Sequence, residues 1–228
     1  MLDNKKARFR DAEWFKRADE FTTPIIIGGA GGIGSWLTML LSRAINPNVP
    51  IYIFDYDRVE EVNIAGQIYG LTDINKLKTD ALVQIVKRNC GATNIISQNA
   101  IYGEDSLSSP IMFSAFDNMK ARKAMFNNWK KEAAKNPDSI FIDGRLLAEQ
   151  FQVFFVTPNK ISEYEKYLFD DSEVESENCS YKQTSHFAAN IAAKMVQGFT
   201  NWFVKDTVEL PFYYEEIGSL FLSTIKES

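Results

Sequence analysis

The glycine-rich stretch IIIGGAGGIGSWL, residues 25–37, contains the first residues whose spacing could do chemistry. Gly29, Gly31 and Gly34 complete the pattern G-x-G-x-x-G between an apolar run and a helix-like pattern, and Gly32 lies inside the loop. Such a turn directs the free backbone amides of a helix start toward a phosphate. The pattern predicts a nucleotide-binding loop, which alone suits dinucleotides, ATP and S-adenosylmethionine equally well. A plain tight turn is the alternative.

A second candidate site residue, Asp55, follows the apolar run IYIF at residues 51–54. A carboxylate at the end of the second strand can accept hydrogen bonds from a ribose diol. An enzyme that uses a nicotinamide cofactor and one that uses ATP fit this acid equally well. The residues that follow Asp55 are needed to separate these two kinds of enzyme. The candidate site residues among them are Asp57, Asn63, Gln67, Lys78, Asp117, Asn118 and Arg122.

The ordered set of motifs resembles the ThiF/MoeB and ubiquitin-activating-enzyme superfamily. Its members share G-x-G-G-x-G, a strand ending in D-x-D-x-V, then N-x-x-R-Q, a lysine at a helix start, and T/A-x-D-N-x-x-x-R. The corresponding stretches here are GAGGIG, DYDRV, NIAGQ, Lys78 and AFDNMKAR, and the resemblance covers roughly residues 25–200. The chain is most similar to short members without zinc. The resemblance implies an ATP-dependent adenylyltransferase that activates the C-terminal glycine of a ubiquitin-like or sulfur-carrier protein.

The resemblance also implies a role for each site residue. Asp55 would hold the ribose of ATP, and Lys78 would contact the phosphates. Asp117 would coordinate the Mg²⁺ on which pyrophosphate leaves, because a carboxylate suits this hard cation. Asn63 and Gln67 would position the phosphates or the carrier tail. The remaining residues would contact the nucleotide or brace the floor of the site: Asp57, Asn118 and Arg122.

Two of these assignments have structural alternatives. Lys78 at a helix start could be a solvated charge. Asp117 and Asn118 could be a helix cap, a position that both residue types favour. A nicotinamide-dependent oxidoreductase would explain the glycine loop and Asp55, but it gives no role to Lys78 or to the Asp117–Asn118 pair.

The chain departs from the superfamily pattern at Gly66, where N-x-x-R-Q has its arginine. The change removes a cation that faces the phosphates, and such a charge-assisted contact is worth about 1.5–3 kcal/mol. Gly66 therefore leaves open a non-catalytic protein that keeps the fold and binds a partner. The superfamily also implies a homodimer in which an N-terminal arginine reaches the partner's site, and Arg8 and Arg10 are the candidates here.

The two cysteines, Cys90 and Cys179, are too few for a disulfide framework or a four-cysteine zinc site. Cys179 follows an acidic stretch in SENCSYKQTSHF. In ThiF-like proteins a cysteine at a similar place is linked to the carrier through sulfur, so the resemblance implies a thioester or acyl-persulfide here. A core-filling role is the alternative, and the neighbouring acids oppose thiolate formation. Cys90 is expected to be structural.

The elements that must position these residues alternate along the chain. Apolar runs predict strands at 25–27, 51–54, 93–99, 111–116, 139–143 and 151–156, and amphipathic patterns predict helices at 1–24, from 32 onward, and at 77–89, 117–133 and 186–203. The alternation predicts a Rossmann-like three-layer α/β fold, with a mainly parallel sheet and helices on both faces. The strand at 151–156 is expected to be an antiparallel extension, because its link is too short for a crossover helix.

A chain of 228 residues suits a single domain. We expect an N-terminal helix at 1–24, a nucleotide-binding core at 25–158 and an acidic crossover loop at 159–185. A C-terminal helix and an edge strand or hairpin would occupy 186–228, with Pro211 limiting the pairing of that strand.

The composition limits the partners that the protein could have. A net charge of −5 and a sequence pI near 5.1 disfavour a general nucleic-acid binder. No apolar run approaches the ~20 residues of a membrane helix, and the charged N-terminus has no signal-peptide core. We therefore expect a cytoplasmic protein whose partner is a carrier protein. ATP-driven dehydration of a modified tRNA, a neighbouring reaction in the superfamily, stays open.

Overall fold

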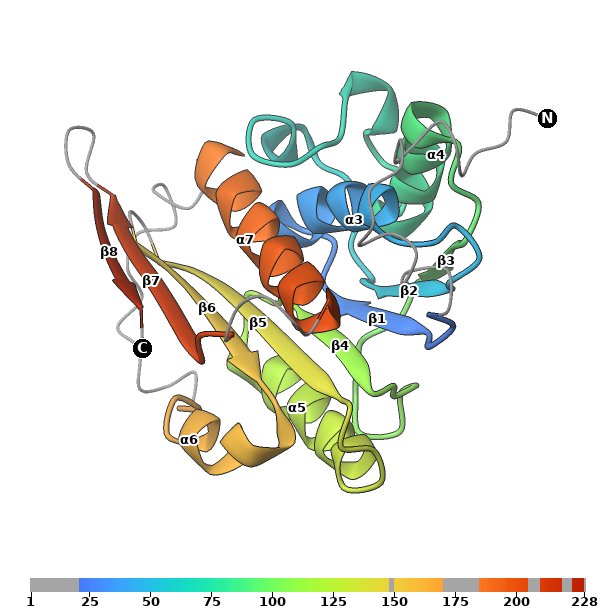
Figure 1. Cartoon of the computed structure of the whole chain (residues 1–228). Helices are drawn as coiled ribbons and strands as arrows, with labels where there is room; N and C mark the ends of the chain where they lie inside the picture. Colours follow the sequence, from blue (N-terminus) through green and yellow to red (C-terminus); the bar gives the residue numbers. More distant parts are fainter. Residues whose placement is uncertain (1–20, 148–149, 170–184, 205–209, 219–222, 228) are drawn as a thin grey trace.

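The computed structural model describes residues 21–147, 150–169, 185–204, 210–218 and 223–227, which form one eight-stranded sheet with helices on both faces (Figure 1). The strands are β1 (Ile25–Gly28), β2 (Ile51–Phe54), β3 (Ile95–Gln98), β4 (Ile111–Ser114), β5 (Ile140–Leu147), β6 (Gln150–Val156), β7 (Tyr213–Gly218) and β8 (Ser223–Glu227). Their spatial order is β3-β2-β1-β4-β5-β6-β7-β8. Strands β1–β5 are parallel, whereas β6, β7 and β8 extend the sheet antiparallel. The predicted fold class is confirmed.

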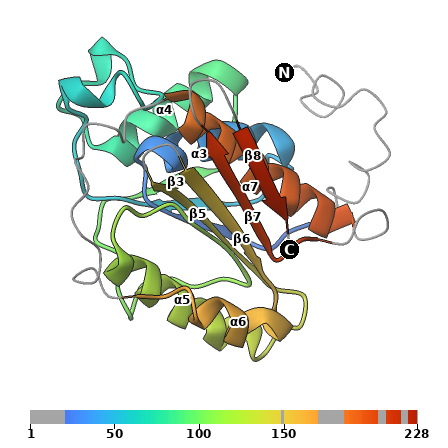
Figure 2. The same cartoon turned by 90° about the vertical axis from the view of Figure 1, so that its left-hand side faces the viewer.

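The helices cover the sheet in two layers (Figures 1 and 2). Their bounds are α3 (Gly32–Ala44), α4 (Lys78–Cys90), α5 (Met119–Ala133), α6 (Ile161–Glu165) and α7 (Ser185–Val204), with short 3-10 turns η1 (Glu61–Asn63), η2 (Leu71–Asp73) and η3 (Pro158–Lys160). Helices α3, α4 and α7 pack on one face, and α5 and α6 pack on the other. None of the helices in the described part of the chain is long and apolar enough to cross a membrane.

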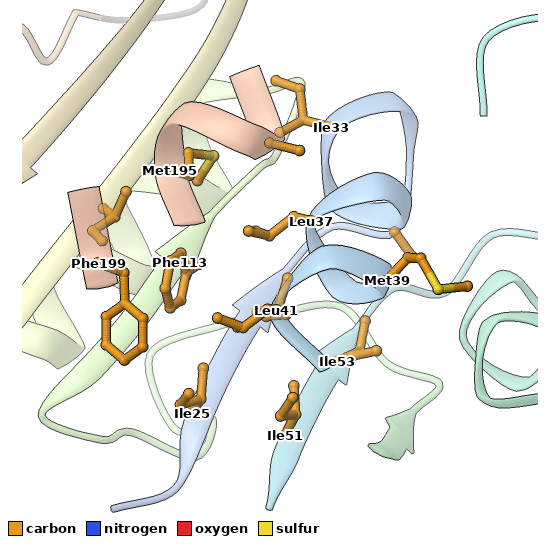
Figure 3. Close-up of a cluster of buried hydrophobic side chains, with 14 of the residues drawn as sticks. Ile25, Ile33, Leu37, Met39, Leu41, Ile51, Ile53, Phe113, Met195 and Phe199 are labelled. Atoms are coloured by element: carbon orange, nitrogen blue, oxygen red, sulfur yellow. The ribbon is translucent and has the colours of Figure 1, made fainter. Parts of the chain in front are cut away.

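The central strands are apolar on both faces, as parallel strands covered by helices must be. Ile25 and Ile27 belong to one buried cluster with α3, α4 and α7, whereas Ile26 between them belongs to a second cluster with α5. This alternation follows from the two-residue period of a strand. Figure 3 shows Leu37 of α3 and Phe199 of α7 in the first cluster. The carboxyl ends of the parallel strands are thus held from both sides.

Several boundaries differ from those expected from the sequence. Strand β5 continues to Leu147, beyond the predicted end at residue 143, because its second half pairs with β6. The region predicted as a loop at 159–185 is partly helical, with η3 and α6 in its described part. Tyr164 of α6 is fully buried, and its ring centroid lies 4.7 Å from that of Phe126. This contact anchors α6 to the second cluster. The acidic run at 170–177 lies outside the described residues.

The two ends of the chain also need correction. The predicted N-terminal helix lies mostly outside the described residues, and residues 21–24 form no regular element. Of the expected edge strand or hairpin, the structure shows a hairpin, whose first strand begins at Tyr213, two residues after Pro211. That strand, β7, pairs with both β6 and β8, so the edge of the sheet is formed by β8 instead. Pro211 precedes the strand, where its missing N–H costs no ladder hydrogen bond.

Candidate nucleotide-binding site

The sheet brings the ends of three strands together at its centre. Gly28 at the end of β1 lies opposite Phe54 of β2 and Ser114 of β4. The glycine loop, Asp55 and the segment leading to Asp117 therefore begin at the same edge of the sheet. The strand order reverses beside β1, and ligands of open α/β sheets bind in the crevice at such a point. The topology thus unites motifs that are far apart in the sequence.

The glycines of the loop meet three different requirements. Gly29 has a φ of +89°, a conformation that a side chain rarely adopts. A Cβ on Gly34 would collide with the carbonyl oxygen of Gly29, so this position needs close packing of helix and loop. A Cβ on Gly31 would meet no atom within 4 Å. These are the three uses of glycine in a dinucleotide-type loop, and the open space at Gly31 is where a phosphate could approach the backbone.

The start of α3 leaves backbone donors for a ligand. Gly31 is the N-cap of this helix, and no side chain caps it. The first amides of a helix have no partner within the helix, and they carry the positive end of its dipole. The loop therefore offers donors and favourable polarity to an anion.

Asp55 connects the glycine loop to the chain that follows β2. Its Oδ2 accepts a hydrogen bond from the Ala30 amide at 2.7 Å, and its Oδ1 accepts one from the Asp57 amide at 2.8 Å. Each carboxylate oxygen has two lone pairs, so both oxygens keep capacity for a ribose hydroxyl. Asp55, the residue predicted to bind the ribose, thus also holds the glycine loop in place.

Lys78 is buried at the start of α4, which contradicts the alternative of a solvated charge. Its Nζ lies 2.9 Å from Oδ2 of Asp57, and its backbone amide donates to the Asp57 carbonyl at 2.9 Å. Because Asp57 donates in turn to Asp55, the three residues form a continuous chain of contacts. The structure therefore links Lys78 to the glycine loop through Asp57 and Asp55.

Asn63 and Gln67 lie in the segment that follows Asp57. The side-chain oxygen of Asn63 accepts from the Glu60 amide at 2.8 Å and caps η1, so part of its capacity is used locally. Within the described part of the chain, the side-chain oxygen of Gln67 is buried without a hydrogen-bond partner. Gly66, at the position of the superfamily arginine, is buried, and its amide lies 3.3 Å from the Asn63 carbonyl.

Asp117 and Asn118 differ in what they do. Asn118 caps α5, because its Oδ1 accepts from the Ala121 amide at 2.8 Å. The cap alternative is therefore confirmed for this residue. Asp117 is exposed after β4 and accepts from the side chain of Asn118 at 3.3 Å. No group of three or more metal-binding side chains occurs among the described residues. Mg²⁺ in phosphate sites commonly uses one or two carboxylates plus the phosphates.

Arg122 lies beneath the site rather than on its surface. Its side chain is 5% exposed and forms an ion pair with the fully buried Asp143 of β5. It also donates to the hydroxyl of Ser114 and the carbonyl of Gly144, both at 3.4 Å. Asp143 is shared with Arg145 at 2.7 Å. Arg122 thus joins α5 to β4 and β5, the position from which it could brace the floor of the site.

Sequence reasoning missed one residue at the loop, Tyr69. Its hydroxyl donates to the Ala30 carbonyl at 2.7 Å. The sequence carries no signal for this hydrogen bond, because its partners lie 39 residues apart. Cys179, Arg8 and Arg10 lie outside the described residues. Cys90 is half-buried, and its Sγ lies 3.2 Å from the Val86 carbonyl.

Comparisons with known proteins find the same fold and a family match. One similar solved structure is that of E. coli MccB with ATP, which is 14% identical to this chain with a TM-score of 0.69. The match covers 92% of this chain and 65% of that chain. The microcin C7 biosynthetic enzyme MccB with N-formylated MccA is 16% identical with a TM-score of 0.70, and the match covers 93% of this chain and 66% of that chain. PaaA is also 16% identical with a TM-score of 0.70, and the match covers 96% of this chain and 78% of that chain. The chain thus shares the fold of these proteins and spans about two thirds of the length of MccB. A sequence model of the ThiF family matches residues 15–209, and the chain therefore belongs to the ThiF family.

Proposed function

We propose that this protein binds ATP with Mg²⁺ and adenylates the C-terminal carboxylate of a protein or peptide partner. Membership of the ThiF family supports an adenylyltransferase. The observation that carries the proposal is the chain of contacts from Ala30 through Asp55 and Asp57 to Lys78. These contacts link a lysine to the glycine loop, and a nicotinamide-dependent enzyme would give that lysine no role.

The residues at the site fit ATP. The uncapped start of α3 and the open space at Gly31 suit phosphates, and Asp55 retains acceptor capacity for a ribose. Lys78 would exchange Asp57 for a phosphate oxygen. Asp117 would hold Mg²⁺, which would neutralise charge on the phosphates. Arg122, Asn118 and the remaining assigned residues would support these contacts.

The proposed reaction needs no protein nucleophile. An oxygen of the partner's carboxylate attacks the α-phosphorus of ATP, and a new O–P bond forms. The bond from the α-phosphorus to the bridging oxygen breaks, and its electron pair leaves with pyrophosphate. The carboxylate is already ionised at neutral pH, so no general base is needed. The task of the site is to hold and spread negative charge with amides, lysine and metal.

We further propose that the partner is a ubiquitin-like or sulfur-carrier protein ending in glycine, and that the enzyme acts as a cytoplasmic homodimer. In onward transfer, the thiolate of Cys179 would attack the carbonyl carbon of the acyl adenylate, the bond from that carbon to the phosphate oxygen would break, and AMP would leave as the thioester forms. Replacing Cys179 with alanine should then leave adenylation intact and remove the covalent carrier adduct in non-reducing electrophoresis. An adduct that persists in the variant would exclude this cysteine.

The first test is calorimetric titration of the whole chain with Mg-ATP and, separately, with NAD⁺ and NADH. We expect micromolar binding of Mg-ATP, loss of that binding in Asp55→Ala, and no binding of either nicotinamide. The second test is ATP–pyrophosphate exchange with a panel of carrier proteins that end in Gly-Gly. Binding of NAD⁺ in place of ATP would overturn the proposal in favour of an oxidoreductase.

Gly66 favours a second candidate, a non-catalytic member that binds a partner without turning over ATP. The superfamily arginine is missing at this position, and the described part of the chain leaves the oxygen of the neighbouring Gln67 unpartnered. A carrier that binds the protein but supports no pyrophosphate exchange would identify this candidate. Recovery of exchange in Gly66→Arg would then locate the defect.

A further inference from the structure

Both polar backbone groups of Ala30 are held by side chains from other segments. The amide of Ala30 donates to Oδ2 of Asp55 at 2.7 Å, and its carbonyl accepts from the hydroxyl of Tyr69 at 2.7 Å. Asp55 follows β2, whereas Tyr69 lies between η1 and η2. Tyr69 is 3% exposed, so its hydroxyl reaches the loop from within the packed protein.

The carbonyl of Ala30 and the amide of Gly31 belong to one planar peptide group. In a trans peptide these two groups point in opposite directions, and the protein has no cis bond among its described residues. A hydrogen bond that directs the Ala30 carbonyl toward Tyr69 therefore directs the Gly31 amide away from it. Gly31 is the residue whose missing Cβ faces open space. The Tyr69 hydroxyl thus fixes the direction of the amide at the point of the loop where a Cβ would meet no atom within 4 Å.

We infer that Tyr69 is a positioning residue for nucleotide binding, which holds the Ala30–Gly31 peptide so that the Gly31 amide faces the phosphates. This inference rests on the proposed function, because it names a further residue of the same site. Tyr69 acts through the backbone and does not touch the ligand.

The hydroxyl of Tyr69 remains a donor at working pH. Burial raises its pKa well above the usual range, and the carboxylates of Asp55 and Asp73 raise it further. The neighbouring segment is tied to the same helix start, because the Ile68 amide lies 3.4 Å from the hydroxyl of Ser35 on α3. The segment around Tyr69 therefore packs on the loop through more than one contact.

The chain offers a matched control in Tyr102. It is also 3% exposed, and its hydroxyl donates to a backbone carbonyl, that of Leu107, at 2.9 Å. It belongs to the cluster on the opposite face of the sheet. Tyr69→Phe and Tyr102→Phe each remove one buried hydroxyl and the hydrogen bond that it donates, and Tyr102→Phe also removes the one that its hydroxyl accepts from the Asn128 side chain at 3.3 Å. Only the hydrogen bond of Tyr69 ends on the glycine loop.

The experiment compares wild type with the two variants as whole chains. We measure Mg-ATP affinity by calorimetry, thermal unfolding, and hydrogen exchange of residues 29–34 without nucleotide. Tyr69→Phe should weaken Mg-ATP binding about tenfold, the equivalent of one charge-assisted hydrogen bond, and should speed exchange in the loop. Tyr102→Phe should lower the unfolding temperature to a similar extent while leaving affinity and loop exchange as in wild type.

The outcomes separate this inference from the proposed function. If wild type and Tyr69→Phe bind Mg-ATP equally and exchange equally in the loop, Tyr69 is only a packing residue and the inference is wrong. If both tyrosine variants lose affinity in proportion to their stability, the inference is also wrong. If wild type binds no Mg-ATP, the proposed function itself fails, and the role of Tyr69 in it fails too.

Discussion

Lys78 and Asp57 form an ion pair of unequal exposure, in which the lysine side chain is 10% exposed and the carboxylate 48%. The buried partner is the cation, and water reaches the anion. An exposed carboxylate gains little from its pairing, because solvent screens it. If the ammonium group of Lys78 exchanged Asp57 for a phosphate, the exchange would therefore cost little free energy. The buried aliphatic part of the lysine side chain could stay where it is. Under the proposed function, the pair would hold a cation near the glycine loop for an incoming phosphate.

Replacing Lys78 with methionine should weaken Mg-ATP binding by a factor of about ten to one hundred, because a charge-assisted contact is worth about 1.5–3 kcal/mol. Calorimetric titration measures the change. Lys76→Met is the matched control, since Lys76 is two residues away and pairs with Asp73 at 3.0 Å. It should leave the affinity within about threefold of wild type, because Lys76 pairs with Asp73 rather than with Asp57. Equal losses in both variants would show a general effect of charge.

Asp117 and Asn118 should separate metal binding from stability. Asp117→Ala should abolish magnesium-dependent pyrophosphate exchange and leave the unfolding free energy nearly unchanged, because the side chain is exposed. Asn118→Ala should lower the unfolding free energy by about 1 kcal/mol, because it removes the cap of α5. Exchange assays and urea unfolding test the two effects. Normal adenylation by Asp117→Ala would show that the metal assignment is wrong.

Arg122→Met should lower the unfolding free energy by about 3 kcal/mol, because it leaves the buried carboxylate of Asp143 with one guanidinium fewer. Urea unfolding measures this loss. Lys135→Met, just beyond the opposite end of α5, removes the ion pair of the exposed Lys135 with Glu132 and should cost less than about 1 kcal/mol. A small effect of Arg122→Met would mean that the residue does not brace the sheet.

The carboxyl of Asp73 should make stability depend on acid pH. Burial alone would raise its pKa, but the Gly70 amide and Lys76 outweigh burial and hold the pKa below its usual range. The stabilisation is therefore present above the pKa of Asp73 in the unfolded chain, about 3.9. It is lost as the pH falls through the pKa of Asp73 in the folded protein.

Asp73→Asn should therefore be less stable than wild type by about 1–2 kcal/mol at neutral pH. The difference should shrink as the pH falls below about 4. Urea unfolding across this range measures both quantities, with the exposed Asp105→Asn as the control. A difference that is independent of pH would show that the Asp73 carboxylate is not the stabilising group.

The sequence predicted the order and type of the central elements, because these depend on neighbouring residues. The alternating apolar runs at Ile25–Ile27 and in β2, and the helical periodicity after Gly32, are local signals. The ends of β5 and the position of β7 could not be predicted, because they depend on which strand lies alongside. Tyr164 likewise turned an expected loop into α6 through burial against residues distant in the sequence.

The motifs by themselves determined which residues to inspect: the glycine loop, Asp55, Lys78 and the Asp117–Asn118 pair. Only the tertiary structure decided what each of them touches. It paired Lys78 with Asp57, used Asn118 as a helix cap, placed Arg122 under the sheet beside Asp143, and brought Tyr69 to Ala30. Periodicity and spacing are encoded within a few residues, whereas partners 21 or 39 positions apart are set by strand register and packing.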